Sequence, residues 1–101
     1  MSWANFAKTA LREGKDVQIK PRGHSMTGKV NDGDLVSLSP CEASVLKVGD
    51  IVLVRCKGND YLHLIKAIDG KRFQIGNNKG GINGWVGENA IYGIATKVER
   101  S

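Results

Sequence analysis

The stretch GDIVLVRCKGNDYLHLIKAI, residues 49–68, decides the fold class of this chain. Its first half, residues 51–56, is rich in valine and isoleucine, which are enriched in β-strands. The polar group KGND at 57–60 predicts a hairpin turn, and residues 61–68 predict the returning strand. Two apolar strands joined by so short a turn pair in antiparallel fashion, so the chain is expected to centre on a β-hairpin.

The pattern of short strands and turns continues on both sides of this hairpin. Further strands are predicted at residues 17–20, 35–38, 72–75 and 91–98. The turn cluster NDGD at 31–34 separates two of them, and the glycine-rich residues 76–84 are predicted to be a loop. About six short strands at close spacing are typical of a barrel or a sandwich-like sheet. The expected fold class is therefore all-β.

Residues 2–13 predict the one helix. Its apolar residues follow helical spacing: Trp3, Phe6, Ala7, Ala10 and Leu11. Ser2 can cap its start, and Gly14 can end it in a left-handed conformation. We expect a helix at 1–14 that packs as a lid on one β-rich domain at 15–101, because a chain of 101 residues supports one modest core. The alternative is an arm that docks on a partner.

Composition excludes several classes of function. The net charge is +5, but the basic residues are scattered, which argues for a mixed surface and against a nucleic-acid footprint. Cys41 and Cys56 are expected to be free thiols, and with His24 and His63 they lack the paired spacing of a zinc site. No cofactor or metal is predicted. No apolar run approaches the roughly 20 residues that span a bilayer. We therefore expect no membrane partner and a cytoplasmic location.

Four short motifs follow one another in a distinctive order: GHSM at 23–26, NDGDLV at 31–36, VGDIVLV at 48–54 and IYGI at 91–94. This ordered set resembles that of the LexA-like repressor peptidases and the type I signal peptidases. The resemblance covers about residues 20–98. It implies a small β-ribbon barrel of that family, here with one short N-terminal helix, and serine endopeptidase activity. Because the sequence shows neither the membrane anchor of the signal peptidases nor the helix-turn-helix of the repressors, we expect a stand-alone peptidase domain.

The resemblance implies that Ser25 is the nucleophile and that one general base activates it. A serine hydroxyl attacks poorly until a neighbouring group accepts its proton. Gly23 lets a substrate approach the backbone closely, and backbone N–H groups near Ser25 can stabilise an oxyanion. Gly23, His24 and Met26 thus form the expected substrate and oxyanion region, with His24 at its rim.

Two residues of one predicted strand compete for the role of base. His63 falls where the family base falls and titrates near neutrality, so it needs no large pKa shift. Lys66 is the alternative base, because an apolar setting lowers the pKa of a lysine. The two residues are separated by an odd number of positions, so in a regular strand they face opposite sides. Unless a bulge intervenes, only one of them can face Ser25.

The chain departs from the family pattern at three points. Gly28 stands where a proline is usual, Leu64 where an arginine follows the base, and Asn77-Asn78 where the histidine-type enzymes carry an aspartate. Asn77 or Asn78 can orient His63, although an amide stabilises an imidazolium less well than a carboxylate does. These departures leave open a catalytically weak or inactive LexA-like regulatory or binding module.

The expected partner is a peptide or protein substrate that binds in extended form along a sheet edge. The resemblance also allows a homodimer. A third class of function, a small basic nucleic-acid-binding barrel, fits less well, because Trp3 and Phe6 lie on the helix and not on a stacking strand.

Overall fold

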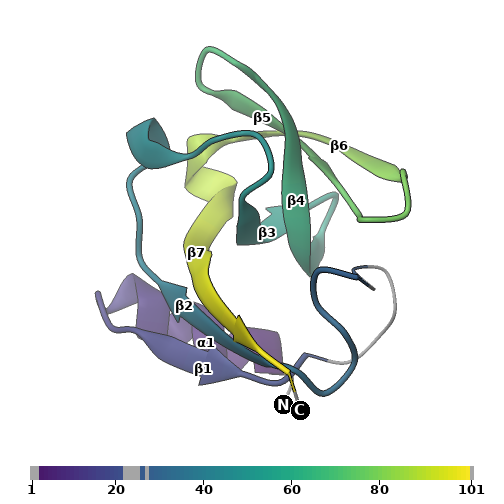
Figure 1. Ribbon diagram of the computed structural model, residues 1–101. Coiled ribbons are helices and arrows are strands. Elements are labelled where there is room, and N and C mark those ends of the chain that lie inside the picture. Colours follow the sequence, from purple (N-terminus) through teal and green to yellow (C-terminus); the bar gives the residue numbers. More distant parts are fainter. Residues whose placement is uncertain (1–2, 22–25, 27, 101) are drawn as a thin grey trace.

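A computed structural model describes residues 3–21, 26 and 28–100. Within them the chain forms a curled antiparallel sheet of seven strands in the order β1-β2-β7-β3-β4-β5-β6 (Figure 1). The strands are β1 (Val17–Ile19), β2 (Leu35–Ser39), β3 (Ile51–Cys56), β4 (Asn59–Asp69), β5 (Arg72–Gly76), β6 (Ile82–Gly87) and β7 (Ile91–Glu99). They are accompanied by helix α1 (Trp3–Arg12) and the short 3₁₀ helices η1 (Ala43–Val45) and η2 (Glu88–Ala90). The all-β prediction is confirmed.

The hairpin of β3 and β4 stands at the centre of the fold. Its register runs from Ile51 opposite Leu64 to Cys56 opposite Asn59. Lys57 and Gly58 form its two-residue turn with φ of +51° and +82°. Positive φ at both central residues matches the twist of an antiparallel pair, which explains why so tight a turn suffices. Strand β4 accordingly begins two residues before the predicted position 61.

The predicted boundaries of the loop at 76–84 are wrong at both ends. Gly76 ends β5, and β6 begins at Ile82, so that Gly76 pairs with Ile82 and Arg72 pairs with Gly87. The local sequence is polar and rich in glycine, which disfavours a strand. Its backbone pairs with β5 all the same, and Val86 packs into the core. Tertiary pairing overrides local propensity here.

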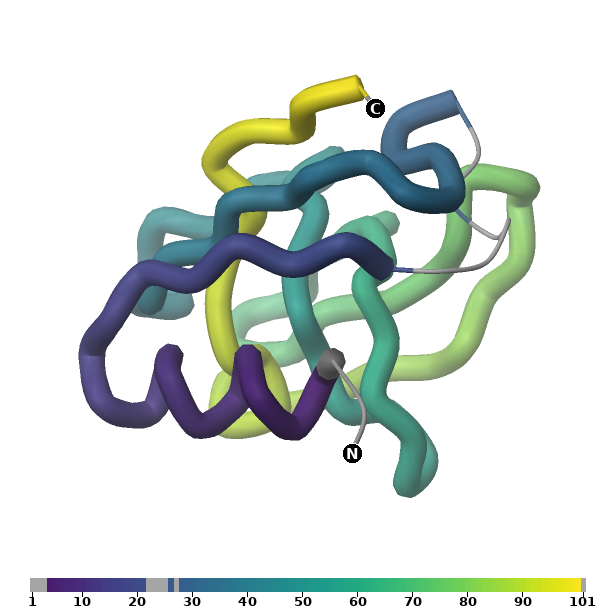
Figure 2. Tube along the Cα trace, turned by 90° about the horizontal axis from the view of Figure 1, so that it is seen from below, coloured from purple at the N-terminus to yellow at the C-terminus, as the bar shows by residue number. Residues whose placement is uncertain are grey.

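The curled sheet has two hydrophobic clusters. One packs beneath α1 and contains Leu38, Leu53, Leu62 and Leu64. The other contains Val52, Ile65, Phe73 and Ile75, together with Val86 of β6. Strand β4 contributes to both clusters, because successive side chains point to opposite faces of a strand. Figure 2 shows α1 covering one side of the sheet.

Helix α1 packs against the sheet through its small residues and Leu11. Ala7 and Leu11 are buried, whereas Phe6 remains 59% exposed, so its predicted place on the buried face is wrong. The Lys8 ammonium lies 2.8 Å from an Asp60 carboxylate oxygen at the start of β4. Gly14 follows the helix with φ of +79° and donates to the Leu11 carbonyl, as expected of a terminating glycine. No helix among the described residues is both long and apolar enough to cross a bilayer.

Candidate active site

His63 lies in the middle of β4, opposite Val52 of β3, and is only 4% exposed. Its Nδ1 atom lies 2.7 Å from the Leu62 carbonyl oxygen. Because a carbonyl oxygen can only accept a hydrogen bond, Nδ1 carries the proton in this contact, and the lone pair is on Nε2. The ring also stacks on Tyr61, with 4.6 Å between ring centroids. The imidazole is thus held in one tautomer by its own strand.

The surroundings of His63 favour its neutral form. Burial lowers the pKa of the imidazole from its ordinary value of 6.5, the hydrogen bond to Leu62 opposes this shift, and the positive charge of Lys66 adds to it. The folded protein therefore holds His63 as a neutral ring near pH 7, which is the form that accepts a proton.

This lowered pKa predicts a pH dependence of stability. Below pH 6.5 the unfolded chain binds a proton at His63 before the folded chain does, so the free energy of unfolding falls as the pH falls. The loss begins near the unfolded pKa and is complete below the folded pKa. Urea unfolding of the wild type and of His63→Gln, followed from pH 7.5 to pH 5, checks this. An identical pH dependence in the two proteins would contradict it.

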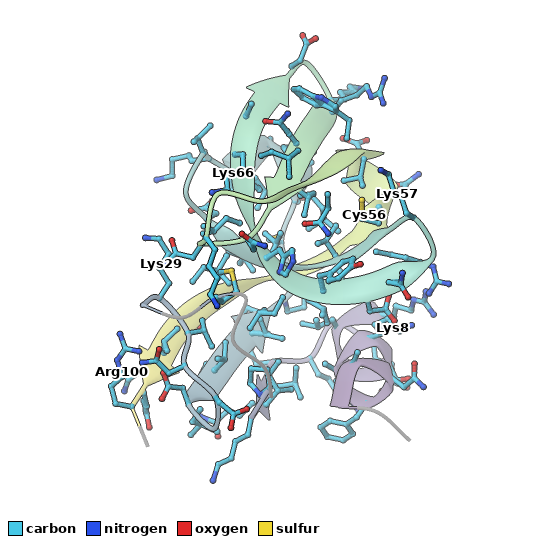
Figure 3. All side chains as sticks on the ribbon, turned by 90° about the vertical axis from the view of Figure 1, so that its right-hand side faces the viewer. Lys8, Lys29, Cys56, Lys57, Lys66 and Arg100 are labelled. Carbon is cyan, nitrogen blue, oxygen red and sulfur yellow. The ribbon has the colours of Figure 1, made fainter. Side chains whose placement is uncertain are left out.

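Lys66 occupies a β-bulge. Ile65 pairs with Ile75 and Ala67 pairs with Gln74, so Lys66 is an extra residue in β4. The bulge interrupts the alternation of side chains, and the odd spacing between His63 and Lys66 therefore does not separate them onto opposite faces. The aliphatic chain of Lys66 crosses Gly76, where a Cβ atom would lie 3.0 Å from its Cγ and Cε. Figure 3 shows Lys66 on the same flank of the molecule as Lys29 and Arg100.

The loop after β5 carries the predicted orienting residues. The Asn77 side-chain oxygen accepts hydrogen bonds from the backbone N–H groups of Lys79 and Gly81, each at 2.8 Å. This oxygen therefore holds the loop's own turn. Asn78 directs its side-chain amide toward Gly28, where a Cβ atom would lie 3.0 Å from the amide nitrogen. That either asparagine orients His63 stays a prediction.

The segment that follows the predicted nucleophile packs beside β4. Met26 is 4% exposed and belongs to the same cluster as Leu62 and Leu64, the two neighbours of His63 in sequence. Its carbonyl oxygen accepts from the N–H groups of Lys29 and Val30. Gly23, His24 and Ser25 lie outside the described residues, and their roles stay predictions.

Sequence reasoning missed a ring of hydrogen bonds in the same segment. It joins Gly28, Asn31 and Asp34 to Arg100, which follows β7. The NDGD cluster at 31–34 indicated a turn, but no pattern in the sequence connects residue 100 with it. The pairing of β2 with β7, which sets Leu35 opposite Glu99, brings the two together.

The two cysteines are single thiols that belong to no cluster of metal-ligating side chains among the described residues. Cys41 is partly exposed and Cys56 is buried, and both are free thiols. Burial, and secondarily the charge of Asp50, raises the pKa of the Cys41 thiol. Within the described ranges, no three side chains of histidine, cysteine, aspartate or glutamate gather in a way that could hold a metal ion.

The site as described consists of a buried imidazole that is stacked on Tyr61, hydrogen-bonded to the Leu62 carbonyl and influenced by the charge of Lys66. No protein-family model and no curated protein sequence matches the chain.

Proposed function

We propose that this chain is a serine endopeptidase domain in which Ser25 is the nucleophile and His63 is its general base. The observation that carries the proposal is the state of His63, a buried neutral ring with Nδ1 bonded to the Leu62 carbonyl and the lone pair on Nε2. A base must be unprotonated at the working pH and fixed in orientation, and His63 satisfies both conditions.

In the proposed reaction the Ser25 hydroxyl oxygen attacks the carbonyl carbon of a peptide bond while its proton moves to His63 Nε2. The bond from that carbon to the amide nitrogen then breaks, and the imidazolium gives its proton to the departing amine. Water, activated by the same imidazole, hydrolyses the acyl-enzyme. No step needs a cofactor.

The segment next to Ser25 packs against β4 and the loop that follows β5. Met26, the next residue in the chain, shares a hydrophobic cluster with Leu62 and Leu64, whose side chains point to the face of β4 opposite that of His63. Two residues beyond Met26, a Cβ atom at Gly28 would lie 3.0 Å from the Asn78 amide nitrogen, on the loop that leaves β5, the strand next to β4. The proposal adds that Ser25, at the start of this segment, reaches His63.

The proposed substrate is an extended segment of a partner protein. A peptide adds to a sheet through the open edge of an outer strand, and β1 and β6 are the outer strands of this sheet. A cytoplasmic setting and a homodimer are parts of the same proposal.

Two observations favour a second candidate, a catalytically weak or inactive regulatory module on the same scaffold. The Asn77 oxygen is engaged by two backbone N–H groups of its own loop. Nδ1 of His63 is bonded to the neutral Leu62 carbonyl, which stabilises an imidazolium less than a carboxylate does. If the chain is an enzyme, this weaker stabilisation of the imidazolium is expected to make its turnover slow.

A further alternative is a serine peptidase in which Lys66, and not His63, is the general base. The bulge at Lys66 and the effect of its charge on His63 place the two bases within electrostatic reach of each other. Lys66 is thus the competing base for Ser25.

A fluorophosphonate probe tests the proposed function directly, because it forms a bond only to an activated serine oxygen. We expect the wild type to be labelled at Ser25 and Ser25→Ala to remain unlabelled, with peptide mapping by mass spectrometry to identify the site. Ser44→Ala is the matched control and retains full labelling. Labelling that persists in Ser25→Ala would refute Ser25 as the nucleophile, and absence of labelling from the wild type would refute the enzyme and favour the regulatory module.

A further inference from the structure

A closed ring of four residues holds the turn that follows Ser25. The Gly28 N–H donates to the Asn31 side-chain oxygen at 3.0 Å, and the Asn31 N–H donates to an Asp34 carboxylate oxygen at 2.9 Å. The Arg100 guanidinium donates to the same carboxylate oxygen at 2.9 Å and to the Gly28 carbonyl at 3.3 Å. Arg100 thereby closes the ring from the end of β7, which pairs with β2 directly after Asp34.

Glycine suits the backbone conformation of this turn. Gly28 has φ of +101°, a conformation that L-residues rarely adopt, and its N–H and its carbonyl are both held by the ring. A Cβ atom at this position would also meet the Asn78 amide at 3.0 Å. The ring therefore sets the path of the chain from Met26 onward, against the loop that leaves β5.

Arg100 is the cationic member of the ring and pairs with its most buried group. The Asp34 side chain is 3% exposed, while that of Arg100 is 56% exposed. Loss of Arg100 removes one donor to the buried Asp34 carboxylate and the donor to the Gly28 carbonyl, so the ring opens at two points.

We propose that Arg100 is a positioning residue for the nucleophile, holding the Gly28–Asn31–Asp34 turn so that Ser25 meets its base. This rests on the proposed function, since it concerns the reactivity of Ser25. Arg100 itself touches neither substrate nor reacting atoms, and it acts through the turn. Figure 3 shows Arg100 and Lys29 on one flank of the molecule, away from Lys8 on the opposite flank.

Three variants test the proposal: Arg100→Ala, Arg100→Lys and Lys97→Ala. Lys97 is the matched control, because it is a β7 cation whose partner Glu99 is also exposed, with side chains 67% and 44% accessible. Hydrogen exchange of the amides at 28–34 and the rate of fluorophosphonate labelling are measured well below every melting temperature, so that global unfolding contributes nothing.

We expect Arg100→Ala to speed exchange at 28–34 by about tenfold or more, the change that corresponds to losing a hydrogen bond to a charged group. Labelling of Ser25 should slow by a similar factor. Arg100→Lys should recover part of both, since lysine supplies the charge but not the two-pronged geometry. Lys97→Ala should match the wild type.

Each other outcome counts against the proposal. Unchanged exchange in Arg100→Ala overturns the role of Arg100 in the turn, and faster exchange with an unchanged labelling rate overturns its role in positioning Ser25. Equal defects in Arg100→Ala and Lys97→Ala would make the effect one of general surface charge. A wild type that is never labelled refutes the proposed function, and the exchange experiment then still decides whether Arg100 holds the turn.

Discussion

Replacing His63 by glutamine is expected to slow the reaction of Ser25 with a fluorophosphonate by about 10²–10⁴-fold, the usual contribution of a general base. Glutamine is polar and of similar length but accepts no proton from a serine at neutral pH. In the wild type the labelling rate should rise with pH through the folded-state pKa of His63, which lies below 6.5. The measurement is the second-order rate constant of labelling between pH 5 and pH 8.

Lys66→Met is the variant that separates the two candidate bases. With His63 as base, the variant retains most of its reactivity, and the midpoint of its pH profile moves upward, because the Lys66 charge contributes to lowering the pKa of His63. With Lys66 as base, the same variant loses its reactivity and His63→Gln keeps it. That second pattern would contradict the proposed dyad and establish the lysine alternative.

Replacing Leu53 by alanine is expected to reduce the free energy of unfolding by about 2–5 kcal/mol, the range for removing a buried leucine side chain. Leu53 is fully buried in β3, between β4 and β7 in the order of the sheet, and belongs to the cluster beneath α1. Neighbouring strands hold the cavity open on both sides, so little of it can collapse. Urea unfolding followed by tryptophan fluorescence gives the difference.

Val48→Ala is the matched control for this core substitution. Val48 is 61% exposed just before β3, and its truncation should change the free energy of unfolding by less than about 0.5 kcal/mol. A Leu53→Ala protein as stable as Val48→Ala would mean that the sheet does not close over Leu53 as described.

Much of the fold could be predicted because its signals are local. The valine-rich residues of β3, the turn at Lys57-Gly58 and the glycine that ends α1 each state a conformational preference within a few positions. Strand β6 gave no such signal, since its polar, glycine-rich start gains its conformation from pairing with β5. The exposed Phe6 shows the same limit, because helical spacing predicts a stripe but not which edge of that stripe meets the sheet.

Part of the candidate site could likewise be predicted from local sequence, and part could not. His63 could be picked out from its residue type, its place in a strand and the family resemblance, and the structure shows that its side chain is buried. The alternation argument that separated it from Lys66 assumed a regular strand. A bulge depends on how β4 and β5 are paired, which no local pattern states.

The sequence by itself determined that this chain forms antiparallel strands around a central hairpin, because turn chemistry and strand composition act over neighbouring residues. Only the tertiary structure decided which groups surround the His63 side chain, and that Arg100 completes the hydrogen-bonded ring at Gly28. Those contacts join positions up to 72 residues apart. They form because strand pairing in the folded sheet brings these backbone and charged groups next to one another, which no short segment of the chain can do.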